Sequence, residues 1–268
     1  MVSSKDQSRA KRLGGKAIVF VVPLLILLLW DLVVRFGLVP TTLVASPLAT
    51  LNDLALMVRD GTLAKHALIS LARLSLGFAL GTMAGVVFGA WIAVSRLTAK
   101  LFEPTISVLA PIPAIAWVPL LIMLFGIGEV SKILLIAVGT FFVVSTHVIV
   151  GIRGTSRELV ELAQVLGKNN WDLFCFVLFP SALPEIFIGL RVAMGLSWTL
   201  LLISEIIASS EGLGWFIWDA RNFSRPDDLF VGMICVGVLG RLSDTVLLAI
   251  ERASTRWRST YSHWQNNV

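Results

Sequence analysis

Long apolar stretches alternate with short polar segments along most of the chain. Each apolar stretch has about 20 residues, which is enough for a helix to cross a bilayer core of about 30 Å. The pattern predicts about six membrane-spanning helices, at residues 17–34, 68–94, 105–126, 131–150, 186–207 and 229–250. Between the first two, a turn-rich polar segment predicts a short amphipathic helix from about Leu48 to Val58. The expected fold class is therefore an all-α membrane protein.

The composition supports this interpretation. Of the 268 residues, 56% are hydrophobic and only 15% are charged, whereas soluble domains have about 25% charged residues. The apolar runs are continuous rather than alternating, which argues against an outer-membrane β-barrel. The net charge of +5 comes from basic residues clustered beside the spans, which favours a membrane over a nucleic acid as partner. Cys175 and Cys235 are isolated and predict neither a disulfide framework nor a metal site.

The basic residues also predict the orientation. A basic tail, residues 1–16, precedes the first apolar run, and no small-residue cleavage site follows it, so an uncleaved span is favoured over a signal peptide. Most loop lysines and arginines share the side of the N-terminus, which predicts a multi-pass membrane protein with both termini cytoplasmic. The expected organisation is a transmembrane domain over 17–252, with a cytoplasmic insert at 151–183, and a cytoplasmic tail over 253–268.

The insert is unusually polar for this chain and predicts two helices joined by a glycine turn. Thr155 and Glu158 have the spacing of a capping box. Gly167 is expected to end the first helix. The second helix is expected to begin at Asn169 or Asn170. The apolar stripe of the first helix comprises Leu159, Leu162, Ala163 and Leu166, and that of the second comprises Trp171, Phe174, Cys175 and Leu178.

Two prolines mark the far end of the insert. Pro180 is expected to stop the second helix, and Pro184 is expected to begin the fifth span. Within the first helix, Glu161 lies nearly opposite the apolar stripe at 100° per residue. The helix therefore either offers a carboxylate to a partner, or rests on the lipid surface with Glu161 merely solvated.

The insert resembles a known family motif. Glu161-Leu162-Ala163, three residues, Gly167, nine residues and Val177-Leu178-Phe179-Pro180 are similar to the EAA motif of binding-protein-dependent ABC transporter permeases, which reads E-A-A, three residues, G, nine residues, I-x-L-P. The chain departs from this pattern only by apolar replacements, at Leu162, Val177 and Phe179. Residues 111–133, 183–199 and 204–215 also resemble permeases of aliphatic sulfonate, taurine and nitrate importers, the sulfonate and taurine branch most.

The resemblance implies a type I ABC importer permease in which the insert is the coupling helix that docks on an ATPase. The residues that match the motif would form this contact: Glu161, Leu162, Ala163, Gly167 and Pro180. The implied partners are an ATPase homodimer, a second copy of the permease, an extracytoplasmic substrate-binding protein and membrane lipid. ATP and Mg would be bound by the ATPase, and this chain would carry no cofactor and no metal.

The chain shows no motif for ATP hydrolysis or for other catalysis. It lacks a G-x-x-x-x-G-K-[ST] phosphate loop, an H-E-x-x-H metal motif and a G-x-S-x-G nucleophile motif. We therefore expect a non-catalytic permease subunit that forms the path for a small organic anion, such as an aliphatic sulfonate or taurine. The alternatives are a permease of the same family for nitrate, bicarbonate or a vitamin precursor, and an ion-coupled secondary transporter.

Candidates for the path come from irregular backbone and from charge inside the membrane. Pro111 and Pro113 break the third span, and broken helices often border transport pathways. The alternative is a static kink. Trp117, Arg191, Trp198 and Glu205 complete the candidate path.

Further intramembrane residues have two interpretations each. Arg73 or Arg191 would suit an anionic substrate if it faced the path, and would otherwise form interhelical ion pairs or reach the headgroups. Arg241 and Asp244, three residues apart, are placed to neutralise each other. His147 is expected to be a satisfied packing residue rather than a proton relay.

Two further features also keep two interpretations. A stripe of glycines in the second span indicates either plain tight helix packing or a sliding surface. The external segment 212–228 is either a docking surface or an aromatic anchor in the membrane interface. The glycine stripe comprises Gly77, Gly81, Gly85 and Gly89.

Overall fold

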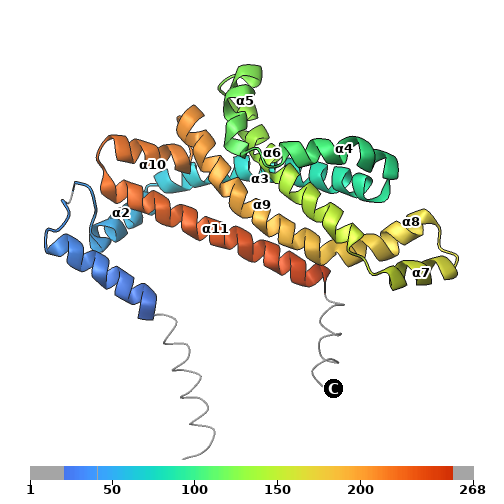
Figure 1. Cartoon of the computed structure of the whole chain (residues 1–268). Coiled ribbons are helices and arrows are strands. Elements are labelled where there is room, and N and C mark those ends of the chain that lie inside the picture. The colour runs from blue at the N-terminus through green and yellow to red at the C-terminus, as the bar shows by residue number, and fades with distance from the viewer. Residues whose placement is uncertain (1–20, 41, 256–268) are drawn as a thin grey trace, which may run out of the picture. The chain divides into compact units, whose positions relative to one another are not determined.

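The structure is a computed structural model that describes residues 21–40 and 42–255. It is helical throughout, and no strand occurs within these ranges (Figure 1). Residues 21–35 are helical. The further helices are α2 (Pro47–Arg59), α3 (Thr62–Val94), α4 (Arg96–Leu109), η1 (Ala114–Trp117), α5 (Val118–Phe125), α6 (Glu129–Arg153), α7 (Arg157–Val165), α8 (Asn170–Leu173), a π turn η2 (Phe174–Leu178), α9 (Phe179–Ala208), α10 (Leu213–Asn222) and α11 (Pro226–Ser254).

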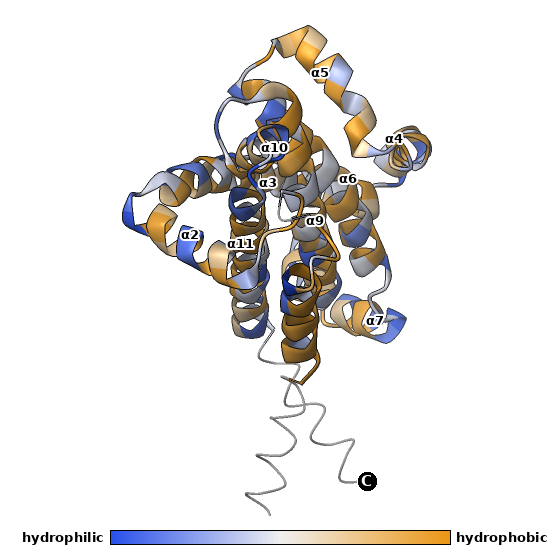
Figure 2. Ribbon diagram, turned by 90° about the vertical axis from the view of Figure 1, so that its left-hand side faces the viewer, coloured by the Kyte–Doolittle hydropathy of each residue, from blue (hydrophilic) through white to orange (hydrophobic). Residues whose placement is uncertain are grey.

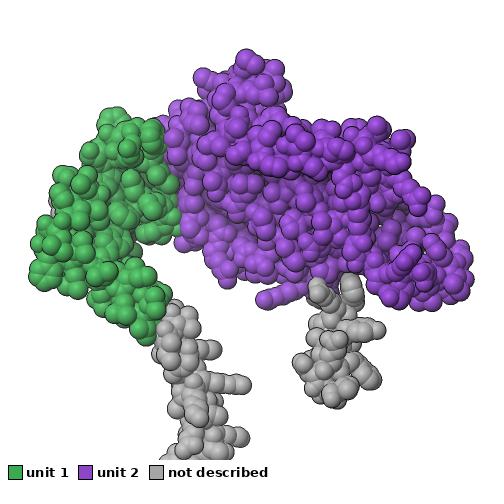
Figure 3. All heavy atoms as spheres, in the orientation of Figure 1, with its two compact units in different colours: residues 1–64, 216–234 green, residues 65–215, 235–268 purple. Residues whose placement is uncertain are grey.

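The chain divides into two compact units (Figure 3). Unit 1 comprises residues 1–64 and 216–234, and unit 2 comprises residues 65–215 and 235–268. Helices α3, α10 and α11 each begin in one unit and end in the other. Unit 2 holds the coupling insert and every candidate path residue.

The predicted all-α membrane fold is confirmed. Within the described residues, four helices are long and apolar enough to cross a membrane, or up to five if a bent pair counts as one span. The four are α3, α6, the continuous helix Asn170–Ala208 and α11, and hydrophobic residues predominate along them (Figure 2). The first predicted span, 17–34, begins outside the described residues, and its remainder belongs to the helix over 21–35. The expected amphipathic helix is α2, which Ser46 caps by accepting from the Ala49 N–H.

The third predicted span is not one straight helix. The segment consists of α4, a turn with Pro111 and Pro113, and η1 continued by α5, and the two halves meet at 96°. The proline ring removes a backbone donor and clashes with the preceding turn, so the chain changes direction there. Pro119 causes no break, because it lies in the first turn of α5, where a proline N–H has no helical acceptor to lose.

Two local expectations in the insert are wrong. Helix α7 begins after Ser156, so Thr155 lies one residue too early to cap it and its buried hydroxyl has no partner. Pro180 does not stop the second helix, since α8, η2 and α9 run on as one helix. In η2 the Phe179 N–H bonds to the Phe174 carbonyl, five residues back, and this wider turn accommodates the proline ring that follows.

Close approach of α6 to its neighbours builds the core of unit 2. The glycine stripe of α3 faces α6: a Cβ atom at Gly81 would overlap the Ala137 carbonyl, and one at Gly89 would lie 2.8 Å from the Ser145 carbonyl. The stripe is therefore a packing surface at backbone distance. Tight contact between small residues is what holds helices together in lipid, where apolar surface gains nothing by leaving the hydrocarbon.

On its other side α6 packs along α9. Gly139 faces Leu200, and the buried Thr140 and Ser197 hydroxyls bond to each other at 2.9 Å. A cluster of buried side chains continues this contact toward α7: Val144, Val148 and Ile152 of α6 with Ala182, Ile186 and Ala193 of α9. Helices α6 and α9 thus form one stiff pair.

Unit 1 has its own packing. The Trp30 indole donates to the Ala45 carbonyl at 2.9 Å, and its ring lies 4.8 Å from that of Phe230. Burial, followed by a hydrogen bond with Asp228 and the charge of that carboxylate, raises the pKa of Asp53 to about 6. Asp60 raises this pKa further, whereas Arg225 lowers it.

The packing of α3 on α6 can be tested with two alanines. Gly81→Ala should lower the midpoint of thermal unfolding in detergent, because its methyl group has no room and overpacking costs about 1–3 kcal/mol. Gly195→Ala is the matched control, since a Cβ atom there meets nothing within 4 Å and alanine is the better helix former. If both variants unfold at the wild-type midpoint, α3 and α6 do not approach as described.

Asp53 predicts a pH dependence. Its pKa is higher in the folded protein than the ordinary 3.8, so its contribution is fully present below about pH 4 and is lost as the pH rises through 6. Asp53→Asn should remove this loss and raise the unfolding midpoint at pH 7. Thermal unfolding between pH 4 and 8 measures both effects. Asp60→Asn, an exposed carboxylate of the same unit, should shift the loss only slightly toward lower pH, because its charge is the smallest of the causes that raise the pKa of Asp53.

Candidate translocation and coupling sites

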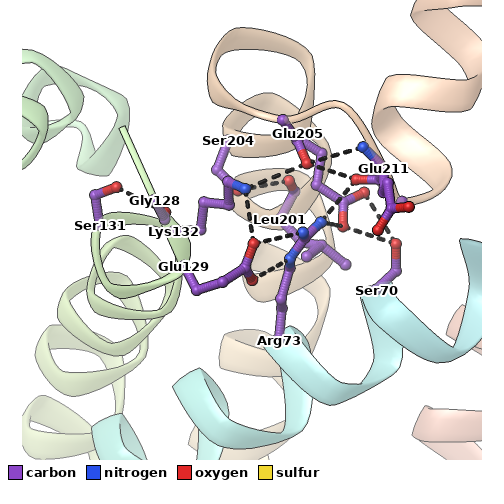
Figure 4. A network of polar contacts seen from close by, with 12 residues as sticks. Ser70, Arg73, Gly128, Glu129, Ser131, Lys132, Leu201, Ser204, Glu205 and Glu211 are labelled. Atoms are coloured by element: carbon purple, nitrogen blue, oxygen red, sulfur yellow. Dashed lines mark hydrogen bonds and ion pairs between the residues drawn. The ribbon is translucent and has the colours of Figure 1, made fainter. Parts of the chain in front are cut away.

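A buried ion network ties α3, α6 and α9 together at one end of unit 2 (Figure 4). We call it the Arg73 network, and it comprises Ser70, Arg73, Glu129, Lys132, Glu205 and Glu211. The Arg73 guanidinium donates to both oxygens of Glu129, at 2.6 and 2.7 Å. Its Nη1 donates to Glu205 Oε1 and to the Glu211 carbonyl, both at 2.8 Å. Arg73 is only 5% exposed, and its guanidinium forms ion pairs with Glu129 and Glu205.

Glu205 is the most deeply placed acid of the network, with 0% of its surface exposed. Besides Arg73, it accepts from the Ser70 hydroxyl and from the Gly214 N–H, each at 2.8 Å. These donors satisfy the buried carboxylate without water, since charge-assisted hydrogen bonds replace its hydration. Gly212 passes so close that any Cβ atom would overlap the Glu205 carboxylate, and its φ of +112° also requires glycine.

The outer residues of the Arg73 network hold the loop that follows α9. Lys132 donates to Glu129 at 3.0 Å and to the Ser209 hydroxyl at 3.2 Å. The hydrogen bond from Lys65 lowers the pKa of the Glu211 carboxyl, and the two charged atoms lie 2.6 Å apart. His66 Nδ1 accepts from the Gly212 N–H at 3.1 Å. The loop into α10 is therefore held to α3 by charge and by backbone donors.

The coupling insert lies at the opposite end of α6 and α9. Helices α7 and α8 lie side by side just beyond the end of α6 (Figure 1). Gly167, at φ +70°, ends α7 as expected: its N–H bonds to the Gln164 carbonyl and the Lys168 N–H bonds to the Ala163 carbonyl. Asn169 caps α8 by accepting from the Asp172 N–H at 2.8 Å.

The motif residues of the insert have mixed environments. Glu161 points outward with its side chain 66% exposed, and Arg157 lies 3.7 Å away on the same face. Ala163 is buried, whereas Leu162 of the expected stripe is exposed. Pro180 lies half-buried at the start of α9. The other large exposed apolar side chains of the insert are Leu159, Val165, Leu166, Trp171 and Phe176. Several exposed apolar side chains on one short segment are typical of an interaction surface.

The candidate path residues fall into two groups. Pro111 and Pro113 are exposed in the turn of the broken helix, and the next segment packs on α6, where a Cβ atom at Gly139 would lie 3.4 Å from Ala114. Trp117 stacks on Phe142. The remaining candidate, Glu205, belongs to neither group: it lies in the Arg73 network, where its side chain is fully buried.

Arg191 and Trp198 form the second group, on the face of α9 toward α11. Arg191 donates to Asp244 of α11 at 2.8 Å, and Arg241 donates to the same carboxylate at 3.0 Å, as its spacing predicts. Trp198 is buried, and its indole N–H has no partner. Their roles in transport stay predictions.

Four interhelical pairs were not found from the sequence. Arg73 pairs with Glu129 and Glu205, His147 Nδ1 lies 2.8 Å from Glu185 Oε1, and Arg153 donates to both oxygens of Glu103. The partners are 38 to 132 residues apart, and no local spacing indicates such pairs. His147 is a satisfied packing residue, as expected.

Residues 81–258 match the model of one protein family, the binding-protein-dependent transport system inner membrane component. The chain belongs to this family. The family model covers the broken helix, the coupling insert and α9, and it leaves out α2. The EAA resemblance is therefore confirmed at the level of the family.

Several curated members of the family are similar over most of their length. The aliphatic sulfonates transport permease protein SsuC of Bacillus subtilis is 36% identical over 89% of this chain and 87% of its own. The taurine transport system permease protein TauC of Escherichia coli is 33% identical over 74% and 72%. The nitrate import permease protein NrtB of Synechocystis is 31% identical over 68% and 66%.

Solved structures of similar fold are also ABC transporters. The MetNI methionine transporter in inward-facing conformations matches with a TM-score of 0.60 at 19% identity, over 69% of this chain and 93% of that one. An amino acid ABC transporter with histidines matches with a TM-score of 0.51 at 17% identity, over 75% and 96%. These structures agree in fold with what the family and its similar members show: this chain is an ABC importer permease subunit and a multi-pass membrane component.

The Arg73 network predicts a large loss of stability on breaking it. Arg73→Met should lower the free energy of unfolding by about 3–5 kcal/mol, because it leaves Glu205 charged and buried without its partner. Arg153→Met is the control, since its ion pair with Glu103 is also bidentate but exposed, and such pairs contribute about 1 kcal/mol or less. Denaturant titration in detergent compares the two. Equal losses would contradict the burial of the network.

Proposed function

We propose that this chain forms part of the translocation path of an ABC importer for a small organic anion, such as an aliphatic sulfonate or taurine. A separate ATPase drives it through the insert at 151–183. The observation that carries the coupling proposal is that the insert, which lies between two spans, exposes the Glu161 carboxylate and several large apolar side chains. The similarity to SsuC and TauC supports the substrate class.

The mechanical part of the proposal follows from helix stiffness. Helix α6 has 25 residues, so it spans about 37 Å from the Arg73 network to the insert. Its packing on α9 leaves no compliant layer between the two helices, because glycines and buried side chains fill the contact. A displacement of α7 by the ATPase therefore moves α6 and α9 together, and the broken helix that rests on α6 moves with them.

The proposal requires partners, because this chain has no phosphate-loop motif with which to bind ATP. ATP and Mg are bound by an ATPase homodimer that docks on α7 through Glu161, Leu162, Ala163 and Gly167. A second copy of the permease covers the apolar helix faces that one copy leaves open, α11 above all. An extracytoplasmic substrate-binding protein delivers the anion. The complex lies in the bacterial inner membrane with both termini of this chain cytoplasmic, because the insert must face the cytosolic ATPase.

A nitrate importer permease is the second candidate. The similarity to NrtB supports it, and nitrate, like a sulfonate, is a small oxyanion. The path chemistry required of this chain is the same for both substrates.

The coupling proposal predicts the effect of one charge reversal. Glu161→Lys should abolish co-purification of the ATPase with the permease, because the docking carboxylate becomes a like charge for its basic partner. Glu158→Lys is the matched control: it is exposed on the same helix, and binding should be retained. If Glu161→Lys retains the ATPase at the level of the control, α7 does not couple through this residue.

A further inference from the structure

Arg241 is an exposed cation in the middle of an apolar helix. It lies about 20 Å from either end of α11 at 1.5 Å per residue, and its side chain is 74% exposed. A charge held against hydrocarbon is costly, so the face with Arg241 opens onto water, a partner or a passing ion.

The carboxylates near Arg241 do not neutralise it. Asp244 accepts from both Arg191 and Arg241, so two guanidinium groups share one carboxylate. Glu251, in the last turn of α11, also attracts Arg191, but the structure shows no ion pair between these two described residues.

Four further acids of the described spans of unit 2 are engaged elsewhere. Glu129 and Glu205 pair with Arg73, Glu103 pairs with Arg153, and Glu185 contacts His147. Within ion-pair distance, the cluster of Arg191, Arg241 and Asp244 therefore carries one net positive charge.

A second, independent feature borders the same contact between α9 and α11. Trp198 is 6% exposed, and its Nε1 donor has no acceptor. Unpaired buried N–H groups are rare in folded proteins. A Cβ atom at Gly240 would lie 3.9 Å from this nitrogen, and Gly240 directly precedes Arg241. Trp198 follows Arg191 by seven residues, so both are on the same face of α9.

We propose that Arg241, Arg191 and the Trp198 N–H form an anion-binding site between α9 and α11, where the sulfonate group of the cargo pauses on its way through the membrane. This inference rests on the proposed function and adds the residues that recognise the charge. A guanidinium presents paired donors that match two oxygens of an oxyanion, and the indole N–H donates to a further one.

Asp244 has a defined part in this site. It orients both arginines through its two oxygens. It also reduces their net charge from two to one, which keeps the anion from binding too tightly to leave. A path must hold its cargo strongly enough to admit it and weakly enough to release it.

The test is uptake of [35S]ethanesulfonate by proteoliposomes that contain the complete complex with ATPase and binding protein. Arg241→Gln should lower the initial rate by at least about tenfold, and Trp198→Phe, which keeps an aromatic ring but removes the donor, by about tenfold. Arg241→Lys should recover much of the rate because it restores the charge. Arg252→Gln, which removes a positive charge near the end of the same helix, should stay within about twofold of wild type.

Thermal unfolding of each variant separates recognition from folding. An Arg241→Gln complex that transports at the wild-type rate overturns the site. Equal losses of rate and of unfolding midpoint in Arg241→Gln and Arg241→Lys also overturn it, since they indicate a structural role. A wild-type complex that accumulates none of ethanesulfonate, taurine or nitrate, while its ATPase still responds to the binding protein, overturns the proposed substrate class and this site with it.

Discussion

Contact at backbone distance between α6 and its two neighbours is the constraint on which the rest of unit 2 depends. Inside a bilayer the hydrophobic effect does not press helices together, so the helices adhere only where their surfaces fit closely. Glycines of α3 and small side chains of α9 allow that fit along α6. Because the fit extends over most of α6, the helix that begins at the Arg73 network ends at the coupling insert as part of one rigid group.

The charged side chains of unit 2 occur in two different environments. The centre of the Arg73 network, Arg73 and Glu205, is buried and its polar groups have partners, so it contributes to the fold and offers nothing to a ligand. The cluster of Arg191, Arg241 and Asp244 lies on an open face with one positive charge in excess. The same residue types thus serve adhesion in one place and recognition in the other, and the difference lies in how many partners the surrounding helices supply.

Much of the local structure follows from the sequence, because it depends on neighbours in the chain. The Gly167 turn, the Asn169 cap and the exposed Glu161 are set by spacing along one helix. Local rules failed where a neighbouring residue competed. Ser156, not Thr155, occupies the N-cap position of α7. A π turn accommodates Pro180, which spacing alone assigned to a helix end.

By itself, the sequence determined the membrane class, the apolar helices, the glycine stripe and the insert with its family motif. Each of these features follows from the amino-acid composition or from a residue spacing that repeats every few positions. Only the tertiary structure decided which charges meet: Arg73 with Glu205 across 132 positions, and Arg191 with the acid that Arg241 also uses. An ion pair between helices depends on how those helices pack, and packing is a property of surfaces that are far apart in the chain.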